Sequence, residues 1–221
     1  MVNASNKITN TILIRGAGEM ATGIAVRLFN SGFEVIMTET SKPSCIRRKV
    51  SFSEAIYDGQ AKVEGVKAVS AESPQHAMAL LKDRVVPVLI DPDLNCLSFI
   101  NPFGLVDATL AKRNLGINKH MAPVVIGVGP GFCAGLDCHA VIESMRGHDL
   151  GRVIYKGRAK ENTGIPGDIM GFTKERVVYA PESGVIELIN DIGDLVEAGQ
   201  TIAKIGSCPV KAPISGALRG M

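Results

Sequence analysis

The residues best suited to bind a ligand form a glycine-rich turn near the start of the 221-residue chain. Gly16, Gly18 and Ala21 have the spacing of a dinucleotide-binding fingerprint, in which the first glycine permits a tight turn and the second lets the backbone approach a pyrophosphate. Ala21 replaces the third glycine and favours close packing of a helix on a strand. The amides of the following helix would hold the phosphate. The alternative is a Rossmann-like turn that binds no nucleotide.

An acidic residue follows at the distance that such a site requires. Glu39 closes the next apolar segment, FEVIMT, roughly 20 residues beyond Gly16. A carboxylate at this place accepts hydrogen bonds from the hydroxyls of an adenosine ribose. The pattern therefore predicts a site for NAD(P) or for another nucleotide-bearing cofactor.

Further polar residues and glycines follow three apolar segments at the points where these segments end. Asp91 follows VPVLI, Asp107 ends GLVD, and Gly129 and Gly131 follow VVIGV. In an open α/β sheet, ligands bind outside the carboxyl ends of the strands, so these residues are expected to line one crevice with the Gly16 turn. Taken singly, each of them also fits an ordinary structural turn.

Two adjacent arginines, Arg47 and Arg48, follow the second apolar segment. Guanidinium groups bind phosphate oxygens in a bidentate manner, so both residues are candidates for clamping phosphates in the crevice. A solvated basic face is the alternative.

The sequence offers one candidate proton-transfer pair and no metal site. Asp137 and His139 would share one face of a strand, although a buried hydrogen-bonded pair is the alternative. No catalytic residue is otherwise assigned. The five cysteines are scattered and include no C-x-x-C pair, which favours reduced thiols. The spacing of Cys133, Cys138, His139 and His148 matches no zinc pattern, so no metal site is predicted.

The elements expected to position these residues alternate between apolar strands and helices. Strands are predicted at Thr11–Arg15, Phe33–Thr38, Ala61–Val69, Val85–Ile90, Leu105–Val106 and Val124–Val128. Helices are predicted from the glycine turn to Asn30 and over Pro74–Lys82. This alternation is typical of a parallel sheet that is buried on both faces. It predicts an α/β fold with a Rossmann-like, mostly parallel sheet over residues 8–150.

The character of the sequence changes near Gly151, after which glycine, proline and short β-like runs dominate. The segment APESG at 180–184 returns as APISG at 212–216, which indicates a repeated β-hairpin unit, with chance recurrence as the alternative. Residues 151–221 are predicted to form a β-rich, incomplete barrel-sandwich-like region, similar to biotinyl and lipoyl domains but without the carrier lysine. Pairing in a homodimer would satisfy its open strand edges.

Composition excludes several classes of function. The formal net charge is +2, only 5% of the residues are aromatic, and no polybasic run is present, so nucleic-acid binding is not expected. No apolar run approaches the roughly 20 residues of a spanning helix, and the N-terminus has no signal-like segment. A cytoplasmic protein with no membrane partner is expected.

The sequence resembles the selenium-dependent molybdenum hydroxylase accessory family (YqeB-like) and, more distantly, the xanthine dehydrogenase accessory family. The resemblance covers nearly the whole chain, and its most specific stretches are IRRKVSFSEAIY, GPGF and RGHDLGRVI. Chains of that family continue beyond Gly220, so this chain is expected to be C-terminally short. The resemblance implies a role in the maturation of molybdenum hydroxylases and supplies no catalytic residue.

Three hypotheses on function come from these observations. The first is a maturation factor that binds a nucleotide or a nucleotide-bearing molybdenum cofactor and acts on a molybdenum hydroxylase apoenzyme. The second is an NAD(P)-dependent oxidoreductase that uses the same crevice. The third is a non-enzymatic docking scaffold. Whether the chain is an enzyme is left open.

Overall fold

The computed structural model describes residues 10–221, which fall into two compact units. The first unit ends at Asn162, and the second comprises Thr163–Met221. The first contains a nine-stranded sheet, and the second contains a three-stranded and a two-stranded antiparallel sheet. The sequence predicts the boundary between the two regions earlier, near Gly151, whereas a strand at Val153–Ile154 still belongs to the large sheet of the first unit.

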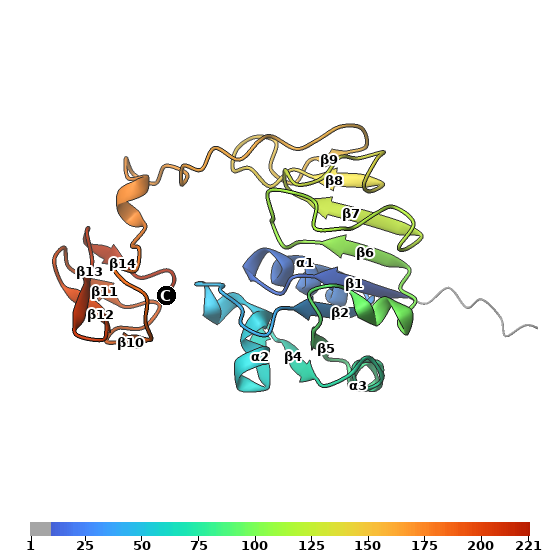
Figure 1. Cartoon of the computed structure of the whole chain (residues 1–221), viewed down its shortest axis with the longest axis horizontal. Helices are drawn as coiled ribbons and strands as arrows, with labels where there is room; N and C mark the ends of the chain where they lie inside the picture. Colours follow the sequence, from blue (N-terminus) through green and yellow to red (C-terminus); the bar gives the residue numbers. More distant parts are fainter. Residues whose placement is uncertain (1–9) are drawn as a thin grey trace, which may run out of the picture. The chain divides into compact units, whose positions relative to one another are not determined.

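The large sheet has the strand order β3-β4-β5-β2-β1-β6-β7-β8-β9 (Figure 1). Its strands are β1 (Thr11–Arg15), β2 (Glu34–Glu39), β3 (Gln60–Val63), β4 (Val66–Ala71), β5 (Val86–Ile90), β6 (Gly104–Asp107), β7 (Val124–Val128), β8 (Ala140–Ile142) and β9 (Val153–Ile154). All pairings from β4 to β8 are parallel, and β3 and β9 add antiparallel edges. The predicted α/β, Rossmann-like, mostly parallel sheet is therefore confirmed.

One predicted strand proved to be two. Residues 61–69 were expected to form a single strand, but the chain turns back at Glu64 and Gly65, whose φ angles are 48° and 84°. Positive φ at both central residues gives the turn that matches the twist of a tight hairpin. Periodicity alone does not detect this turn, because apolar residues continue on both sides of it.

The helices of the first unit are short. They are α1 (Glu19–Asn30), α2 (Ala55–Asp58) and α3 (Pro74–Leu80), with 3-10 turns η1 (Arg48–Val50), η2 (Phe52–Glu54), η3 (Leu81–Asp83) and η4 (Asn95–Ser98). Helix α3 begins as its sequence predicts, because the Ser73 side chain accepts a hydrogen bond from the His76 amide and Pro74 occupies the first turn. No helix in residues 10–221 is long and apolar enough to cross a membrane.

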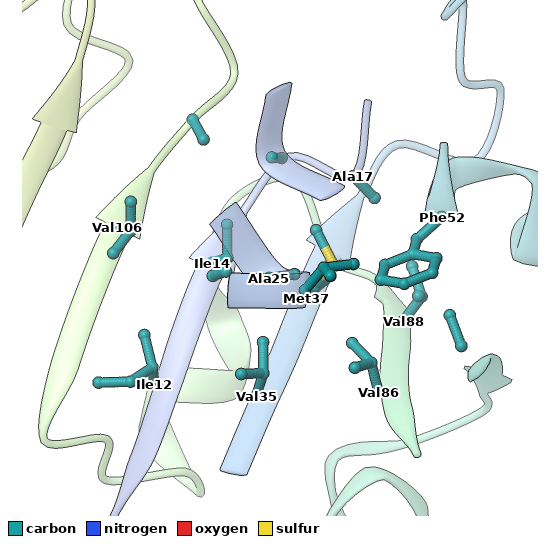
Figure 2. Packing of buried hydrophobic residues seen from close by; sticks show 14 of the residues in the cluster. Ile12, Ile14, Ala17, Ala25, Val35, Met37, Phe52, Val86, Val88 and Val106 are labelled. Carbon is teal, nitrogen blue, oxygen red and sulfur yellow. The ribbon is translucent and has the colours of Figure 1, made fainter. Parts of the chain in front are cut away.

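The sheet is buried on both faces by separate apolar clusters. Alternate residues of β2 divide between them, since Val35 and Met37 pack on the α1 side while Ile36 packs on the other. Figure 2 shows the α1 side, where Ala25 of the helix and Phe52 of η2 cover the strands. This burial of both faces explains why the strands consist of nearly continuous apolar runs.

The second unit has its own small core and open strand edges. Its elements are η5 (Lys174–Arg176), β10 (Ile186–Leu188), β11 (Leu195–Val196), β12 (Thr201–Ile205), β13 (Cys208–Lys211) and β14 (Gly216–Ala217). The sheets are β10-β12-β13 and β11-β14, and the described strands close no barrel. The repeated segments at 180–184 and 212–216 lead into β10 and β14, which lie in different sheets.

Candidate functional site

A cleft of about 590 Å³ lies at the carboxyl edge of the large sheet. The strand order reverses there, because β2 and β5 lie on one side of β1 and β6 and β7 lie on the other. Ligands of open α/β sheets bind at such a switch point. The cleft is lined by Arg15, Gly16, Gly18, Glu19, Met20, Thr38, Glu39, Thr40, Ser44, Cys45, Pro92, Asp93, Ala108, Thr109, Leu110, Ala111 and Leu115.

Gly16 lets two loops approach each other. Its φ is +93°, and an added Cβ would lie 3.2 Å from the backbone of Ala108 and Thr109. Its amide donates to the Thr38 carbonyl oxygen at 2.8 Å, which ties the turn after β1 to the end of β2. The predicted tight turn at Gly16 is thus needed for the fold of the cleft itself.

Gly18 has a different environment, because an added Cβ there would meet the side chain of Cys45 and no backbone atom within 4 Å. It is the N-cap of α1, its φ is −66°, and no side chain caps the helix. The nearest neighbour of an added Cβ would be the Cys45 sulfur, at 3.7 Å. The amides of the first helical turn therefore remain available on the cleft side, where they carry the partial positive charge of the helix.

Glu39 is held in place by backbone amides. One carboxylate oxygen accepts a hydrogen bond from the Ala17 amide at 2.8 Å, and the other accepts one from the Thr40 amide at 2.7 Å. A carboxylate oxygen accepts more than one hydrogen bond, so this group keeps capacity for a hydroxyl in the cleft. The sequence prediction that Glu39 closes β2 beside the glycine turn agrees with this geometry.

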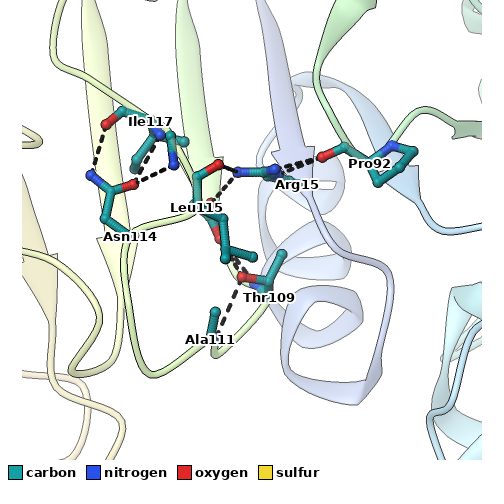
Figure 3. A network of polar contacts seen from close by, with 9 residues as sticks. Arg15, Pro92, Thr109, Ala111, Asn114, Leu115 and Ile117 are labelled. Carbon is teal, nitrogen blue, oxygen red and sulfur yellow. Dashed lines mark hydrogen bonds and ion pairs between the residues drawn. The ribbon is translucent and has the colours of Figure 1, made fainter.

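The buried residue Arg15 connects three segments of the cleft (Figure 3). Nε and Nη2 donate to the Pro92 carbonyl oxygen at 2.9 and 2.6 Å, and Nη1 donates to the Leu115 carbonyl oxygen at 3.1 Å. Nη1 also lies 3.3 Å from Oδ2 of Asp107, whose other oxygen accepts from the hydroxyl of Thr109 at 2.7 Å. The loops after β5 and β6 are thereby fixed to β1.

Several predicted site residues support the cleft without lining it. Asp107 is fully buried against Arg15, and Ala21 is fully buried in the core on the α1 side. Gly129 and Gly131 permit loop packing, since an added Cβ on Gly131 would lie 2.5 Å from the Ala111 carbonyl oxygen. These positions shape the walls of the cleft.

Asp91 also lies outside the cleft lining, and its carboxylate binds groups of the protein itself. Its carboxylate accepts hydrogen bonds from the amides of Asn95 and Cys96 at the start of η4, at 3.0 and 2.7 Å. Partial burial raises the pKa of Asp91, but the hydrogen bonds from Cys96 and Asn95 together outweigh burial and leave the pKa below its usual value. It is the following residues, Pro92 and Asp93, that reach the cleft.

The two arginines form ion pairs outside the cleft lining. Arg47 lies 3.8 Å from Glu19, and Arg48 lies 3.9 Å from Glu54. Glu19 itself lines the cleft, where its second oxygen lies 3.0 Å from the Cys45 sulfur. Burial, and then the bond to Glu19, raise the pKa of Cys45, so its thiol is protonated at neutral pH and is a weak nucleophile.

The candidate proton-transfer pair is occupied by backbone contacts and does not line the cleft. The Cys133 amide donates to Asp137 at 2.7 Å, and the Val125 amide donates to Nδ1 of His139 at 2.9 Å. Within residues 10–221, no group of three or more His, Cys, Asp or Glu side chains could hold a metal ion.

Fold and site together define a Rossmann-like α/β unit whose switch-point cleft carries a glycine turn and an uncapped helix N-terminus. The chain is 51% identical over 210 residues to the uncharacterized protein YqeB of Escherichia coli (strain K12). That stretch covers 95% of this chain and 39% of YqeB, so the chain spans about two-fifths of the length of this relative. No family model and no solved structure matches the chain.

Proposed function

We propose that the cleft binds a pyrophosphate-linked nucleotide, either NAD(P) or a nucleotide-bearing molybdenum cofactor. The uncapped N-terminus of α1 carries this proposal, because no side chain caps the helix and its first residues, Glu19 and Met20, line the cleft beside Gly18. Such amides bind phosphate oxygens without further charged groups. Gly18 lines the cleft and has no Cβ, so a phosphate can lie closer to its backbone than to that of any other residue type.

The carboxylate of Glu39 supports the assignment of the ribose. It closes the strand next to the glycine turn, and the Ala17 and Thr40 amides fix its orientation. A 2′-hydroxyl donates to a carboxylate, whereas a 2′-phosphate is repelled by it. Among NAD and NADP, the cleft is therefore expected to prefer NAD.

We further propose that the chain acts as an accessory factor in the maturation of a molybdenum hydroxylase, with the apoenzyme as its partner. The sequence resemblance to the accessory family supports this role. The oxidoreductase hypothesis is less favoured, because Asp137 and His139 lie outside the cleft lining.

Exposed apolar side chains on the second unit support the homodimer and the docking hypothesis alike. Val185 and Leu195 are 88% and 82% exposed, and Ile186 and Leu188 of β10 are also exposed. A protein contact would remove this apolar surface from water.

The substitution Gly18→Val tests the nucleotide site. The Gly18 backbone, at φ −66°, accepts any residue, and the nearest side chain is that of Cys45, so the fold should persist while the new methyl groups obstruct the phosphate. We expect affinity for NAD⁺, ADP or CDP, whichever the wild type binds, to fall at least tenfold, about 1.4 kcal/mol, in isothermal titration calorimetry. Unchanged affinity in a folded variant would refute the site.

Gly23→Ala is the matched control for this substitution. Gly23 lies in the same helix, outside the cleft lining, and an added Cβ meets nothing within 4 Å. Alanine should stabilise the helix by about 0.8–1.0 kcal/mol and leave nucleotide affinity unchanged. Co-purification of a molybdenum hydroxylase with the wild-type chain tests the partner separately.

A further inference from the structure

The hydroxyl of Thr38 is buried without a hydrogen-bond partner. Thr38 is 0% exposed, and its Oγ1 has no partner within the protein, although its carbonyl oxygen accepts from the Gly16 amide. Buried side-chain hydroxyls are nearly always satisfied, so an exception requires an explanation. Thr38 lines the cleft, and a bound ligand would supply the missing partner.

Thr38 lies on the face of the sheet opposite to α1. Side chains alternate along β2, so Thr38 shares the face of Ile36, which belongs to the cluster on that side, and not the face of Met37. Thr38 is paired in register with Arg15 of β1. The helix amides proposed to hold phosphate are on the α1 side of the sheet, and the Thr38 side chain is on the other side. In a ligand that extends across the carboxyl edge of the sheet, the part near Thr38 is therefore not the phosphate held by α1.

On this side of the cleft, Arg15 has no unpaired positive charge for a ligand. The Arg15 guanidinium is neutralised by Asp107, and its hydrogens go to the carbonyl oxygens of Pro92 and Leu115. The side chains of Pro92 and Leu115 add apolar surface, and Leu115 is 42% exposed. An uncharged group with polar ring atoms suits this environment better than a second phosphate.

We propose that Thr38, Pro92, Asp93 and Leu115 form a second subsite, which takes the uncharged heterocyclic end of the nucleotide and satisfies the Thr38 hydroxyl by a hydrogen bond to a polar ring atom. This assignment rests on the proposed nucleotide site. It adds which part of the nucleotide lies on the side of the sheet opposite to α1. The Asp93 carboxylate adds an acceptor that suits an exocyclic amine.

The test is Thr38→Val, which keeps the shape and the β-branched side chain while removing the hydroxyl. Isothermal titration calorimetry on the full chain uses NAD⁺, ADP and CDP as nucleotide probes and inorganic pyrophosphate as the phosphate probe. We expect at least fivefold weaker binding of the nucleotide that the wild type prefers, and unchanged binding of pyrophosphate. Thr38→Ser, which restores a hydroxyl, should recover most of the affinity.

Ser53→Ala is the matched control, because the Ser53 hydroxyl is also buried without a partner but does not line the cleft. This variant should bind every probe as the wild type does. The melting temperature of Thr38→Val should not fall, since no protein partner loses a hydrogen bond.

Three results would overturn the subsite. If Thr38→Val binds the nucleotide as tightly as the wild type, the hydroxyl makes no ligand contact and the nucleotide site stands without it. If the wild type binds pyrophosphate but no nucleotide probe, the phosphate cradle stands and the second subsite fails. If the wild type binds no probe at all, the proposed nucleotide site fails together with the subsite.

Discussion

Replacing Arg15 by methionine should destabilise the first unit strongly. The guanidinium makes hydrogen bonds to Pro92 and Leu115 and an ion pair with Asp107, whose side chain is 0% exposed. Methionine fills a similar apolar volume but leaves this carboxylate with only its Thr109 contacts. The loops after β5 and β6 would also lose their common anchor.

The magnitude follows from the burial of the pair. Breaking a buried ion pair by removing one partner costs about 3–5 kcal/mol. Because Thr109 still donates to Asp107, we expect a loss near the lower limit, about 3 kcal/mol. In a domain of this size each kcal/mol shifts the melting temperature by about 2–4 °C, so Arg15→Met should melt roughly 6–12 °C below the wild type.

Circular dichroism at 222 nm measures this change in the first unit, because α1, α2 and α3 all lie there among the described residues. The double variant Arg15→Met/Asp107→Asn is the control, since it removes the unpaired charge. It should recover at least about 1 kcal/mol relative to Arg15→Met alone, as coupled neighbours do. A melting temperature of Arg15→Met within 2 °C of the wild type, or a double variant no more stable than the single one, would refute the reasoning.

The remaining predictions concern the ligand, pH and association. Glu39→Gln keeps one oxygen for the amides but removes the charge, so the preference for NAD⁺ over NADP⁺ in calorimetry should fall about tenfold; an unchanged ratio argues against the ribose contact. Burial raises the pKa of Glu143, but hydrogen bonds from the Lys160 and Met145 amides outweigh it, and the pKa is lowered from 4.5. The Glu143 carboxylate therefore stabilises the fold fully above about pH 4.5, and this stabilisation is lost as the pH falls through the lower pKa of the folded state. Below pH 4.5, the melting temperature of Glu143→Gln should consequently depend less on pH than that of the wild type. If the exposed Leu195 contributes to a homodimer, Leu195→Asp should give the monomer mass in light scattering where the wild type gives twice that mass; a monomeric wild type contradicts the dimer.

Local sequence features predicted the central strands of the large sheet and the glycine turn. The apolar runs predicted β1, β5 and β7 to within about one residue, because a strand buried on both faces requires apolar side chains at nearly every position. Gly16 was identified from its place between a strand and a helix, and its positive φ follows from the tight turn that this place requires. The prediction of an α/β fold rested on this alternation and needed no knowledge of long-range contacts.

The identity of the cleft residues depended on the tertiary structure. Arg15 and Thr38 were missed, because each ends an apolar run and its partners lie elsewhere in the chain. The guanidinium of Arg15 contacts Pro92 and Leu115, 77 and 100 residues away, and only the strand order brings these loops together. The sequence feature that could have identified both residues is a charged or hydroxyl side chain at the carboxyl end of an otherwise apolar strand.

The roles of Asp91, Arg47 and Arg48 were likewise decided by contacts that the sequence does not encode locally. All three follow strands of the sheet, but Asp91 caps η4, and the arginines form ion pairs with Glu19 and Glu54. A polar side chain at a strand end binds whichever partner the fold places within hydrogen-bond distance. The sequence by itself therefore determined which edge of the sheet carries the cleft, and the tertiary structure decided which side chains at that edge face it.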